Sequence, residues 1–467
     1  MQGREEDSLA LNQSRSGTPV RDATAIEDAA TPVQPSAWSM RLPKKLMNIN
    51  YVLLIQGQFI SRVGASLTAM VLLLWVKDAT GSASLMGLMS MVSTIPAVLF
   101  GVIGGTWADR HERRKIIAYC DILAGVALLG LAVLFTHVPD NTAVLAVGVV
   151  LTSLFVAVMD TFSTPAITAA VPDIVPRDST ARANSMSQLA LSLALFLGQG
   201  FGGLAYRVFG ALTAVAINGI ASLYAGLTET LVRIPQRIPV EDGGWRPRLA
   251  SFRKDMVAGF HQVLHIPGLN RMVLASALLA FFSAPLILLI PYYVEDFLGL
   301  TKDAVGYLAA TYGVGSLIGS LAAGFVTPSG RQRSRLLVTL MVLQAVGFAV
   351  LGLIRVPGIA FSLVFLGGGI GGFVGVFMVT ILQLSTPSET RGRLFGVLST
   401  IAGALGPAGM GLGGVVFDWI GQDIPTMYLS SGCIMTCLIL LLSTSKDFRD
   451  FLAYEDKANT RPITEQS

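Results

Sequence analysis

Charged residues are scarce in this sequence. Asp, Glu, Lys and Arg together make up 13% of its 467 residues, against about 25% in ordinary soluble domains. Hydrophobic residues make up 52%, and the mean hydropathy is +0.64. A soluble chain of this length carries far more charge on its surface, so these values exclude an ordinary soluble globular protein.

Cysteine and histidine are equally scarce, with three and four copies. Cys120, Cys433 and Cys437 all lie inside apolar segments, where they are best interpreted as small packing residues. The sequence also has no zinc-ligand spacing, no nucleotide-binding P-loop and no catalytic constellation. We therefore expect no metal site, no cofactor and no enzymatic activity. The net charge of +4 is uninformative about nucleic acid, and we expect no nucleic-acid partner.

The chain has instead a series of apolar blocks of about 18 to 25 residues, the length that a helix needs to cross a bilayer. These blocks predict an all-α polytopic membrane protein with twelve transmembrane helices, for which the lipid bilayer is a partner. The predicted spans are 50–76, 84–107, 116–136, 143–170, 182–205, 211–232, 271–294, 304–326, 335–354, 357–384, 394–417 and 425–443.

Basic residues gather in the loops on one side of these spans. That side carries Arg41, Lys44, Lys45, Arg110, Arg113, Arg114, Lys115, Arg177, Arg182, Arg331, Arg333, Arg335, Arg391, Arg393, Lys446 and Arg449. The other side has little beyond Lys77, Arg207, Lys302 and Arg355. Because short basic loops resist translocation, we expect a multi-pass protein with both termini in the cytoplasm.

Composition also divides the chain into segments. Residues 1–45 are polar without an apolar period, which predicts a disordered cytoplasmic tail. The longest connection, 233–270, has apolar residues at helical spacing, which predicts an amphipathic helix on the cytoplasmic membrane surface: Phe252, Met256, Phe260 and Val263. The remaining segments are an N-terminal six-helix half at 46–232, a C-terminal six-helix half at 271–445 and a cytoplasmic tail at 446–467.

The two halves resemble each other in sequence. GGLAYRVFG at 202–210 matches GGVVFDWIG at 413–421, and 413 minus 202 is 211. PRDSTAR at 176–182 matches PSETRGR at 387–393 at the same offset, since 387 minus 176 is also 211. Two matches at one offset indicate a parallel repeat of six spans. Such repeats place a substrate site between the halves, near the middle of the bilayer.

A short motif lies in the loop between predicted spans two and three, GGTWADRHERRK at 104–115. Its Gly105, Asp109, Arg110, Arg113 and Arg114 resemble the signature of the major facilitator superfamily, Gly-x-x-x-Asp-Arg-x-x-Arg followed by Arg or Lys. The resemblance implies a loop whose acidic and basic groups pair in one conformation and separate during transport. The alternative is a basic loop that only fixes topology. The second-half copy has Pro328 where Asp109 would map.

Two longer stretches indicate a branch of that superfamily. The runs TPAITAAVPDIVPRDSTARANSMSQL at 164–189 and PSETRGRLFGVLS at 387–399 resemble bacterial enterobactin exporters and macrolide efflux pumps. The resemblance implies a monomeric secondary transporter of the bacterial inner membrane. It would export a small hydrophobic or amphipathic molecule, such as a drug, a macrolide or a siderophore-like compound, by proton antiport and alternating access.

Two glycine-rich segments bear on the coupling. Proton-coupled exporters of the superfamily usually carry Gly-Pro-x-x-Gly-Gly in span five, whereas this chain has Gln199 and Met410 at the two proline positions. The glycines that allow close helix packing or gating remain: Gly198, Gly202, Gly203, Gly413 and Gly414. This departure weakens the antiport interpretation but not the fold.

Ionisable residues inside a span are costly, and therefore indicate function. Arg62 in span one and Asp160 in span four each lie about 17 Å from the cytoplasmic ends of their spans, at about 1.5 Å per residue. We expect them to pair beside a central cavity, so that protonation of Asp160 would release Arg62 and couple proton flow to transport. A static ion pair that braces two helices is the alternative.

Further polar residues in the spans are candidates for contact with substrate: Gln56, Gln58, Asn218, Gln383 and Tyr292. Packing or interfacial anchoring is the more common role of each of them. Two other functions stay open at this point. A lipid or lysophospholipid carrier would need a lateral opening between spans, and a receptor without transport activity would show no flux.

Overall fold

The computed structural model describes residues 45–236, 261, 268–386 and 388–453, and within them every regular element is helical. The predicted tail at 1–45 and the predicted surface helix in 233–270 lie almost entirely outside these residues. The helices of the first half are α1 (Ile49–Thr80), α2 (Ala83–Val92), α3 (Ile95–Arg110), α4 (Arg113–His137), α5 (Thr142–Ile174), η1 (Arg177–Ser179) and α6 (Thr180–Glu229).

The second half is built in the same way. Its helices are α8 (Leu269–Leu288), α9 (Ile290–Tyr292), η2 (Tyr293–Phe297), α10 (Asp303–Ala323), α11 (Gly330–Leu351), α12 (Pro357–Ser385), α13 (Ser388–Trp419), α14 (Ile424–Thr444) and α15 (Lys446–Leu452). The last of these belongs to the predicted tail at 446–467. Arg271 of α8 holds it through an ion pair of 2.7 Å with Asp447, so this part of the tail is folded.

Ten helices of the described residues are long and apolar enough to cross a membrane. One of them, the 48-residue stretch Arg182–Glu229, would be about 72 Å long at about 1.5 Å per residue, more than twice the thickness of a bilayer core of about 30 Å. Its chain turns at Gly210, where φ is 73° and ψ is 175°, a conformation that favours glycine. With α6 counted as two crossings and the 32-residue α13 added, the helices are consistent with the predicted twelve.

The second predicted span, 84–107, is not one continuous helix. It divides into α2 and α3, with Ser93 and Thr94 in a turn between them. Pro96 follows in the first turn of α3. Proline has no backbone N–H and disfavours a helical conformation in the residue before it, which explains why the helix is interrupted here.

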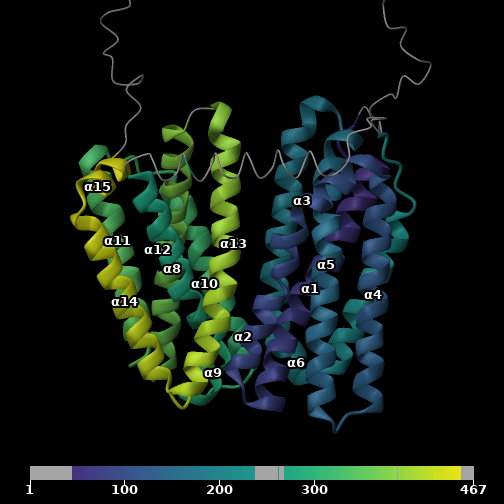
Figure 1. Cartoon of the computed structure of the whole chain (residues 1–467), viewed down its shortest axis with the longest axis horizontal. Helices are drawn as coiled ribbons and strands as arrows, with labels where there is room; N and C mark the ends of the chain where they lie inside the picture. Colours follow the sequence, from purple (N-terminus) through teal and green to yellow (C-terminus); the bar gives the residue numbers. More distant parts are fainter. Residues whose placement is uncertain (1–44, 237–260, 262–267, 387, 454–467) are drawn as a thin grey trace, which may run out of the picture. The chain divides into compact units, whose positions relative to one another are not determined.

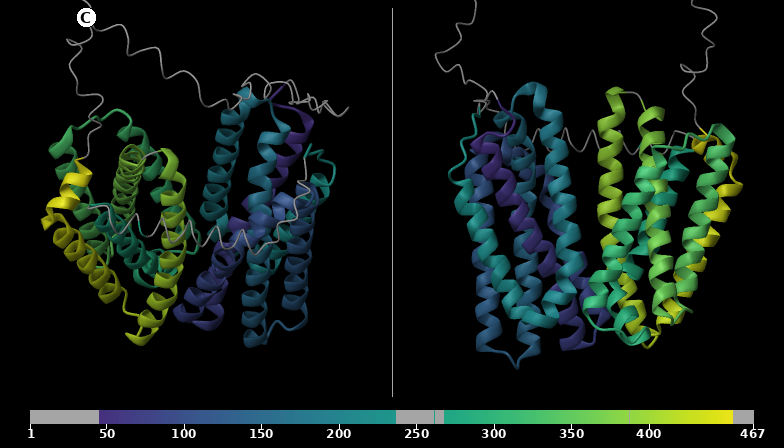
Figure 2. Two further views of the ribbon diagram at one scale, coloured as in Figure 1. Left: turned by 45° about the horizontal axis from the view of Figure 1, so that its top comes forward. Right: turned by 180° about the vertical axis from the view of Figure 1, so that it is seen from behind.

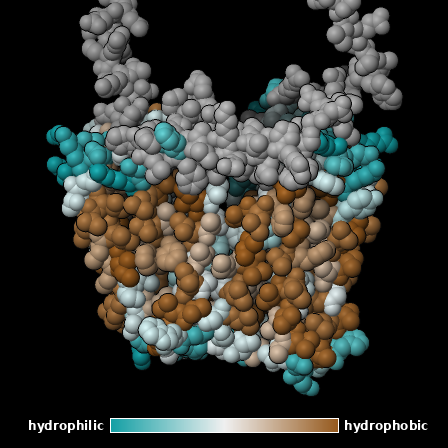
Figure 3. Space-filling model, viewed as in Figure 1, coloured by the Kyte–Doolittle hydropathy of each residue, from teal (hydrophilic) through white to brown (hydrophobic). Residues whose placement is uncertain are grey.

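The described helices form two bundles, one from each half of the sequence, which stand side by side in Figure 1 and in both views of Figure 2. The described ends of the chain lie at the same end of the bundles, which we name the predicted cytoplasmic end. On the face drawn in Figure 3, apolar side chains form a broad belt, with hydrophilic residues above and below it. This distribution matches a bilayer with water on both sides.

The most extensive contacts between the halves are those of α2 with α13 and of α6 with α10, and α3 with α13 and α2 with α8 add smaller ones. One apolar cluster continues across this boundary and includes Leu74 and Met86 of the first half and Leu289, Tyr293 and Phe417 of the second. These residues lie near the opposite end of the bundles, where α1 meets α2, which we name the predicted outer end. The halves are therefore joined through an apolar core at that end.

Candidate functional site

Arg62 of α1 and Asp160 of α5 lie beside each other. The Nη1 atom of Arg62 is 3.4 Å from Oδ1 of Asp160, and its Nη2 donates a hydrogen bond of 3.4 Å to the hydroxyl of Thr164. The side chains are 29% and 45% exposed, although both residues lie well inside their helices. The ion pair is therefore accessible from inside the bundle.

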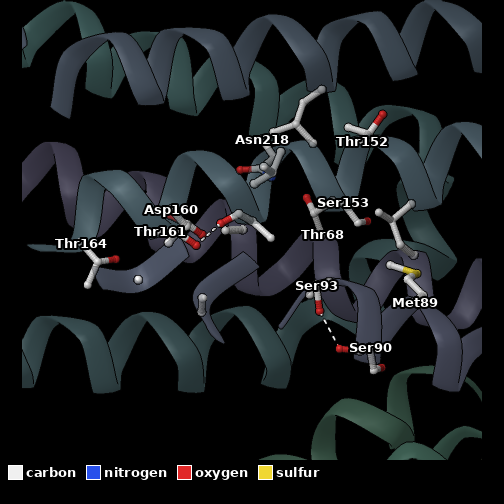
Figure 4. Close-up of a pocket in the computed structure, with 18 of the residues that line it drawn as sticks. Thr68, Met89, Ser90, Ser93, Thr152, Ser153, Asp160, Thr161, Thr164 and Asn218 are labelled. Atoms are coloured by element: carbon white, nitrogen blue, oxygen red, sulfur yellow. Dashed lines mark hydrogen bonds between the residues drawn. The ribbon is translucent and has the colours of Figure 1, made fainter. Parts of the chain in front are cut away.

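Asp160 forms part of the wall of a cavity of about 810 Å³. The wall comes from α1, α2, α3 and α5, with single residues of α4 and α6. Figure 4 shows hydroxyl groups around this space on several helices, together with Met89. The hydroxyls belong to Thr68, Ser90, Ser93, Thr152, Ser153, Thr161, Thr164 and Thr168. Most of the remaining lining is aliphatic, so one carboxylate and several hydroxyls face a largely apolar space.

Asn218 of α6 also reaches this cavity. Its side chain is 3% exposed, and its Oδ1 is buried without a hydrogen-bond partner. A Cβ on Gly64 of α1 would lie 2.5 Å from that oxygen, so glycine at this position leaves the amide its space. A buried acceptor without a partner is costly, so Asn218 places an unsatisfied amide beside the cavity.

The other polar candidates are not gathered at the cavity. Gln56 donates a hydrogen bond of 3.3 Å to the hydroxyl of Tyr224, while Gln383 is exposed near the end of α12. Tyr292 is buried at the predicted outer end, where its ring packs edge to face against Phe417 with centroids 5.2 Å apart. These three residues therefore lie apart from the Arg62–Asp160 pair.

Gln58 leads to a cluster that the sequence analysis missed. Its Nε2 donates hydrogen bonds of 3.2 Å to Oδ2 of Asp121 and 2.8 Å to Oε1 of Glu229. The two carboxyl groups come from α4 and from the last residue of α6. A signal was present in the sequence, because Glu229 lies inside predicted span six, where an ionisable residue is costly.

Arg113, one of the basic residues of the motif, holds the signature loop at 104–115 in place. The guanidinium forms an ion pair with Asp173 at the end of α5 and donates a hydrogen bond of 3.0 Å to the carbonyl of Ala169. It also lies 3.9 Å from the carboxylate of Asp109. The side chain of Gln236 accepts a bond of 3.0 Å from the backbone N–H of Arg113. Arg113 of α4 thus links α3 and α5 through its side chain and the segment at Gln236 through its backbone.

The other residues of the motif contribute less to these contacts. Arg114 lies 3.8 Å from Glu112, and Arg110 lines a small surface cavity beside Tyr119. A Cβ on Gly105 would meet nothing within 4 Å, whereas one on Gly104 would lie 2.5 Å from the carbonyl oxygen of Thr161. The close approach of α3 to α5 therefore requires glycine at 104, one position before the predicted residue.

The predicted packing glycines all lie at close helix contacts. Within the halves, a Cβ on Gly198 or Gly202 would lie 2.5 or 2.6 Å from the Cβ of Ser66 or Met70 in α1, and one on Gly413 would lie 2.4 Å from Pro285 in α8. Gly203 and Gly414 instead face the opposite half of the molecule. Small residues at these points allow the helix backbones to approach.

Ion pairs that join the halves, among the described residues, lie at the predicted outer end. Lys77 of α1 is 7% exposed and lies 3.3 Å from Glu295 and 3.0 Å from Asp296. Asp78 forms an ion pair with Lys302. Arg207 lies 3.1 Å from Asp303. Burial raises the pKa of Glu295, and the neighbouring Lys77 opposes this shift only in part.

A fifth contact at this end uses a carboxylate as a helix cap. Asp418 of α13 accepts hydrogen bonds from the backbone N–H groups of Ala83 and Ser84, at 3.1 and 2.8 Å, and from the hydroxyls of Ser82 and Ser84, at 3.0 and 2.6 Å. Burial tends to raise the pKa of Asp418, but the bonds from Ser84 and its neighbours outweigh this effect and hold the pKa below its usual range. The carboxylate thus satisfies the free N–H groups at the start of α2.

Comparison with known proteins places these features in context. The family model of the Major Facilitator Superfamily matches residues 54–297 and 272–461. Macrolide efflux protein A of Streptococcus pyogenes is 25% identical over 403 residues, which cover 84% of this chain and 95% of the relative. Enterobactin exporter EntS of Shigella boydii serotype 4 is 28% identical over 344 residues, covering 73% and 79%.

Solved structures support the same fold. A bacterial homologue of the human lysosomal transporter Spinster, in an inward-facing and unoccupied conformation, has a TM-score of 0.62 and 16% identity, covering 88% of this chain and 98% of that structure. A D-xylose–proton symporter has a TM-score of 0.64 and 15% identity, covering 84% and 96%. The fold predicted from the sequence is thereby confirmed.

Proposed function

Because the chain belongs to the Major Facilitator Superfamily, we propose that it exports a small hydrophobic or amphipathic compound by proton antiport, with Asp160 as the coupling group. The observation that carries the proposal is the position of Asp160. Its carboxylate lies on the wall of the 810 Å³ cavity and 3.4 Å from Arg62. One group therefore contacts both the space for substrate and a cation that its protonation would release.

The chemistry of the cavity favours an amphipathic ligand. Its volume of about 810 Å³ lies within the range of about 300 to 1,000 Å³ typical of sites for drug-sized molecules. Aliphatic side chains and Met89 can adapt to varied apolar shapes, while the hydroxyls and Asn218 can pair with scattered polar groups. The relatives are named for the export of macrolides and of enterobactin, and another for multidrug efflux, which supports export in this chain.

We further propose that the protein lies in the bacterial plasma membrane with both termini in the cytoplasm, as the basic loops predict. In that orientation, the ion pairs between the halves close the outer side. The arrangement then corresponds to an inward-facing state. A substrate would enter from the cytoplasm or the inner leaflet, and release would require these outer contacts to separate.

Dye efflux from vesicles with an imposed pH gradient tests the function. A lipophilic cation and a neutral macrolide serve as substrates, and wild type is compared with Asp160→Asn. The matched control is Asp140→Asn, which changes an exposed carboxylate in the loop between α4 and α5. We expect the gradient to drive efflux by wild type and by the control but not by Asp160→Asn. Equal efflux by all three would remove Asp160 from the coupling, and no efflux by wild type would contradict transport of these compounds.

A further inference from the structure

The cluster of Gln58, Asp121 and Glu229 lies behind the Arg62–Asp160 pair and is more deeply buried. Asp121 is 8% exposed and Glu229 is 1% exposed. Both receive a bond from the same nitrogen, Nε2 of Gln58. Two carboxyl groups from different helices therefore meet around a single amide.

The cluster contains too little positive charge for two carboxylates. No Lys or Arg of the described residues lies within ion-pair distance of either carboxyl group, and the amide of Gln58 carries no charge. The nearest cation that acts on both is Arg62, which is already paired with Asp160. Two ionised groups in one buried place repel each other, and burial of an unpaired charge is costly.

A second observation is an oxygen of this cluster that lacks a hydrogen-bond donor. Oε2 of Glu229 is fully buried and has no hydrogen-bond partner. An ionised carboxylate oxygen in this position would be left without a donor, which costs about 1 to 3 kcal/mol or more. A proton on one of the two carboxyl groups removes this cost, because the new O–H can donate to an oxygen of the other group.

We propose that Asp121 and Glu229 hold one proton between them and form a buried proton site separate from Asp160. The O–H of one carboxyl group donates to the carboxylate of the other, and Gln58 donates to both. The pair then carries a single negative charge. The shared proton belongs to both residues, as in other closely spaced pairs of carboxyl groups.

The site is linked to Asp160 through α1. Gln58 and Arg62 are four residues apart, so both lie on the same face of that helix. The titratable groups that face the pair are Arg62, Cys120 beside Asp121, and Asp160. If Asp160 is protonated, the charge of Arg62 is no longer balanced by it and favours the ionised form of the buried pair. This coupling rests on the proposed function, and it makes uptake of a proton at Asp160 favour release of the shared one.

Infrared spectroscopy of the purified full-length protein tests the site without any measurement of transport. A protonated carboxyl group has a carbonyl stretch that a carboxylate lacks. We expect this band in wild type at neutral pH, and we expect it to disappear in Asp121→Asn and in Glu229→Gln. Both substitutions keep the size of the side chain, and the single remaining carboxylate can be ionised with Gln58 as donor. Asp140→Asn should retain the band, whereas Asp160→Asn, which leaves Arg62 without its partner as protonation of Asp160 would, should lose the band at a lower pH than wild type.

The outcomes separate the two proposals. If wild type has no such band at neutral pH, or if the band persists in both Asp121→Asn and Glu229→Gln, there is no shared proton. A band that depends on added monovalent cations would also contradict the proposal, because a bound cation would then balance the charge. If the band behaves as expected but efflux by Asp160→Asn is unchanged, the shared proton stands and only the proposed function is contradicted.

Discussion

Gly203 and Gly414 occupy the same position in the two halves, and each lies against the backbone of the opposite half. The offset is again 211, since 414 minus 203 is 211. A Cβ on Gly203 would lie 2.3 Å from the carbonyl oxygen of Lys302, and one on Gly414 would lie 2.3 Å from that of Ala83. These two carbonyls stand at the starts of α10 and α2. The halves are thus closed at the predicted outer end by two contacts that the repeat makes equivalent.

We predict that Gly203→Ala and Gly414→Ala each open the predicted outer end. The methyl group cannot fit unless one half moves, and overpacking of this kind costs about 1 to 3 kcal/mol. A cost of about 1.4 kcal/mol would shift the ratio of closed to open molecules about tenfold. Spin labels at positions 140 and 353, in outer loops of the two halves, report the distance by double electron–electron resonance in a cysteine-free background.

Gly130→Ala in α4 is the matched control for this measurement. It makes the same chemical change in a helix of the first half, but its Cβ would meet nothing within 4 Å. The distance distribution should then equal that of the parent protein. If Gly203→Ala and Gly414→Ala also leave it unchanged, the two glycines do not hold the halves together.

The helix cap formed by Asp418 should make closure of this end sensitive to acid. Its pKa is lowered, so the ionised form is favoured when the end is closed. The contribution of Asp418 is therefore complete above the usual Asp range near pH 3.9 and is lost as the pH falls through the lowered value. The spin-label distance should lengthen in acid, and the pH at which it changes lies below the usual Asp range.

Asp418→Asn should weaken closure at neutral pH by about 1 to 3 kcal/mol. Both oxygens of the carboxylate accept hydrogen bonds from the N–H and hydroxyl donors, whereas the amide has only one acceptor oxygen. The substitution should also remove the acid-dependent step that belongs to this site. Asp423→Asn is the control, since Asp423 caps α14 within its own half. An acid-dependent step that survives in Asp418→Asn would assign it to another group.

Much of the fold could be predicted because each signal was local. The predicted span 50–76 corresponds to α1. The offset of 211 in the sequence identifies the equivalent glycines of the two halves. The breaks were harder. Pro96 interrupts span two, although the span is largely apolar on both sides of it. Gly210 turns the chain between two spans, because a single glycine can reverse its direction without a loop.

The site was predictable only where depth along the helix was sufficient evidence. Counting residues from the cytoplasmic ends gave Arg62 and Asp160 similar depths, and the structure brings them to 3.4 Å. Glu229 was missed because it stands in the last turn of its span, where a charge usually reaches water. The burial of Lys77 was not predicted, because the predicted span one ends at residue 76 and leaves Lys77 in the following loop. Burial by a neighbouring half is not visible in a local pattern.

Lys77 illustrates how such a buried cation can be tested. Lys77→Met should destabilise the protein by about 3 to 5 kcal/mol, because it leaves the half-buried Glu295 without its counter-charge. The double variant Lys77→Met/Glu295→Gln should recover most of this loss, since neither charge then remains. The midpoint of thermal unfolding in detergent measures both. If the double variant is as unstable as the single one, the pair with Glu295 is not the reason for the burial of Lys77.

The Arg62–Asp160 pair allows the two interpretations of an intramembrane ion pair to be separated. A brace depends on opposite charges at the two positions, whereas coupling depends on a carboxyl group at the cavity. The cavity wall includes Asp160 but not Arg62. The exchange Arg62→Asp/Asp160→Arg would keep the charges paired and move the carboxyl group away from the wall. Because both side chains are partly exposed, we expect either single variant to lose no more than about 1 kcal/mol of stability.

We predict that the exchanged protein inserts and unfolds like wild type but does not drive dye efflux with a pH gradient. Asp160→Glu, which keeps an acid at the wall, should retain part of the gradient-driven rate. Transport in vesicles and the unfolding midpoint are measured on the same preparations. If the exchange restores efflux that Asp160→Asn has lost, opposite charges are sufficient, and the pair is a brace between α1 and α5. If only an acid at position 160 supports efflux, the proton must bind on the cavity wall, where its arrival can change what the cavity holds.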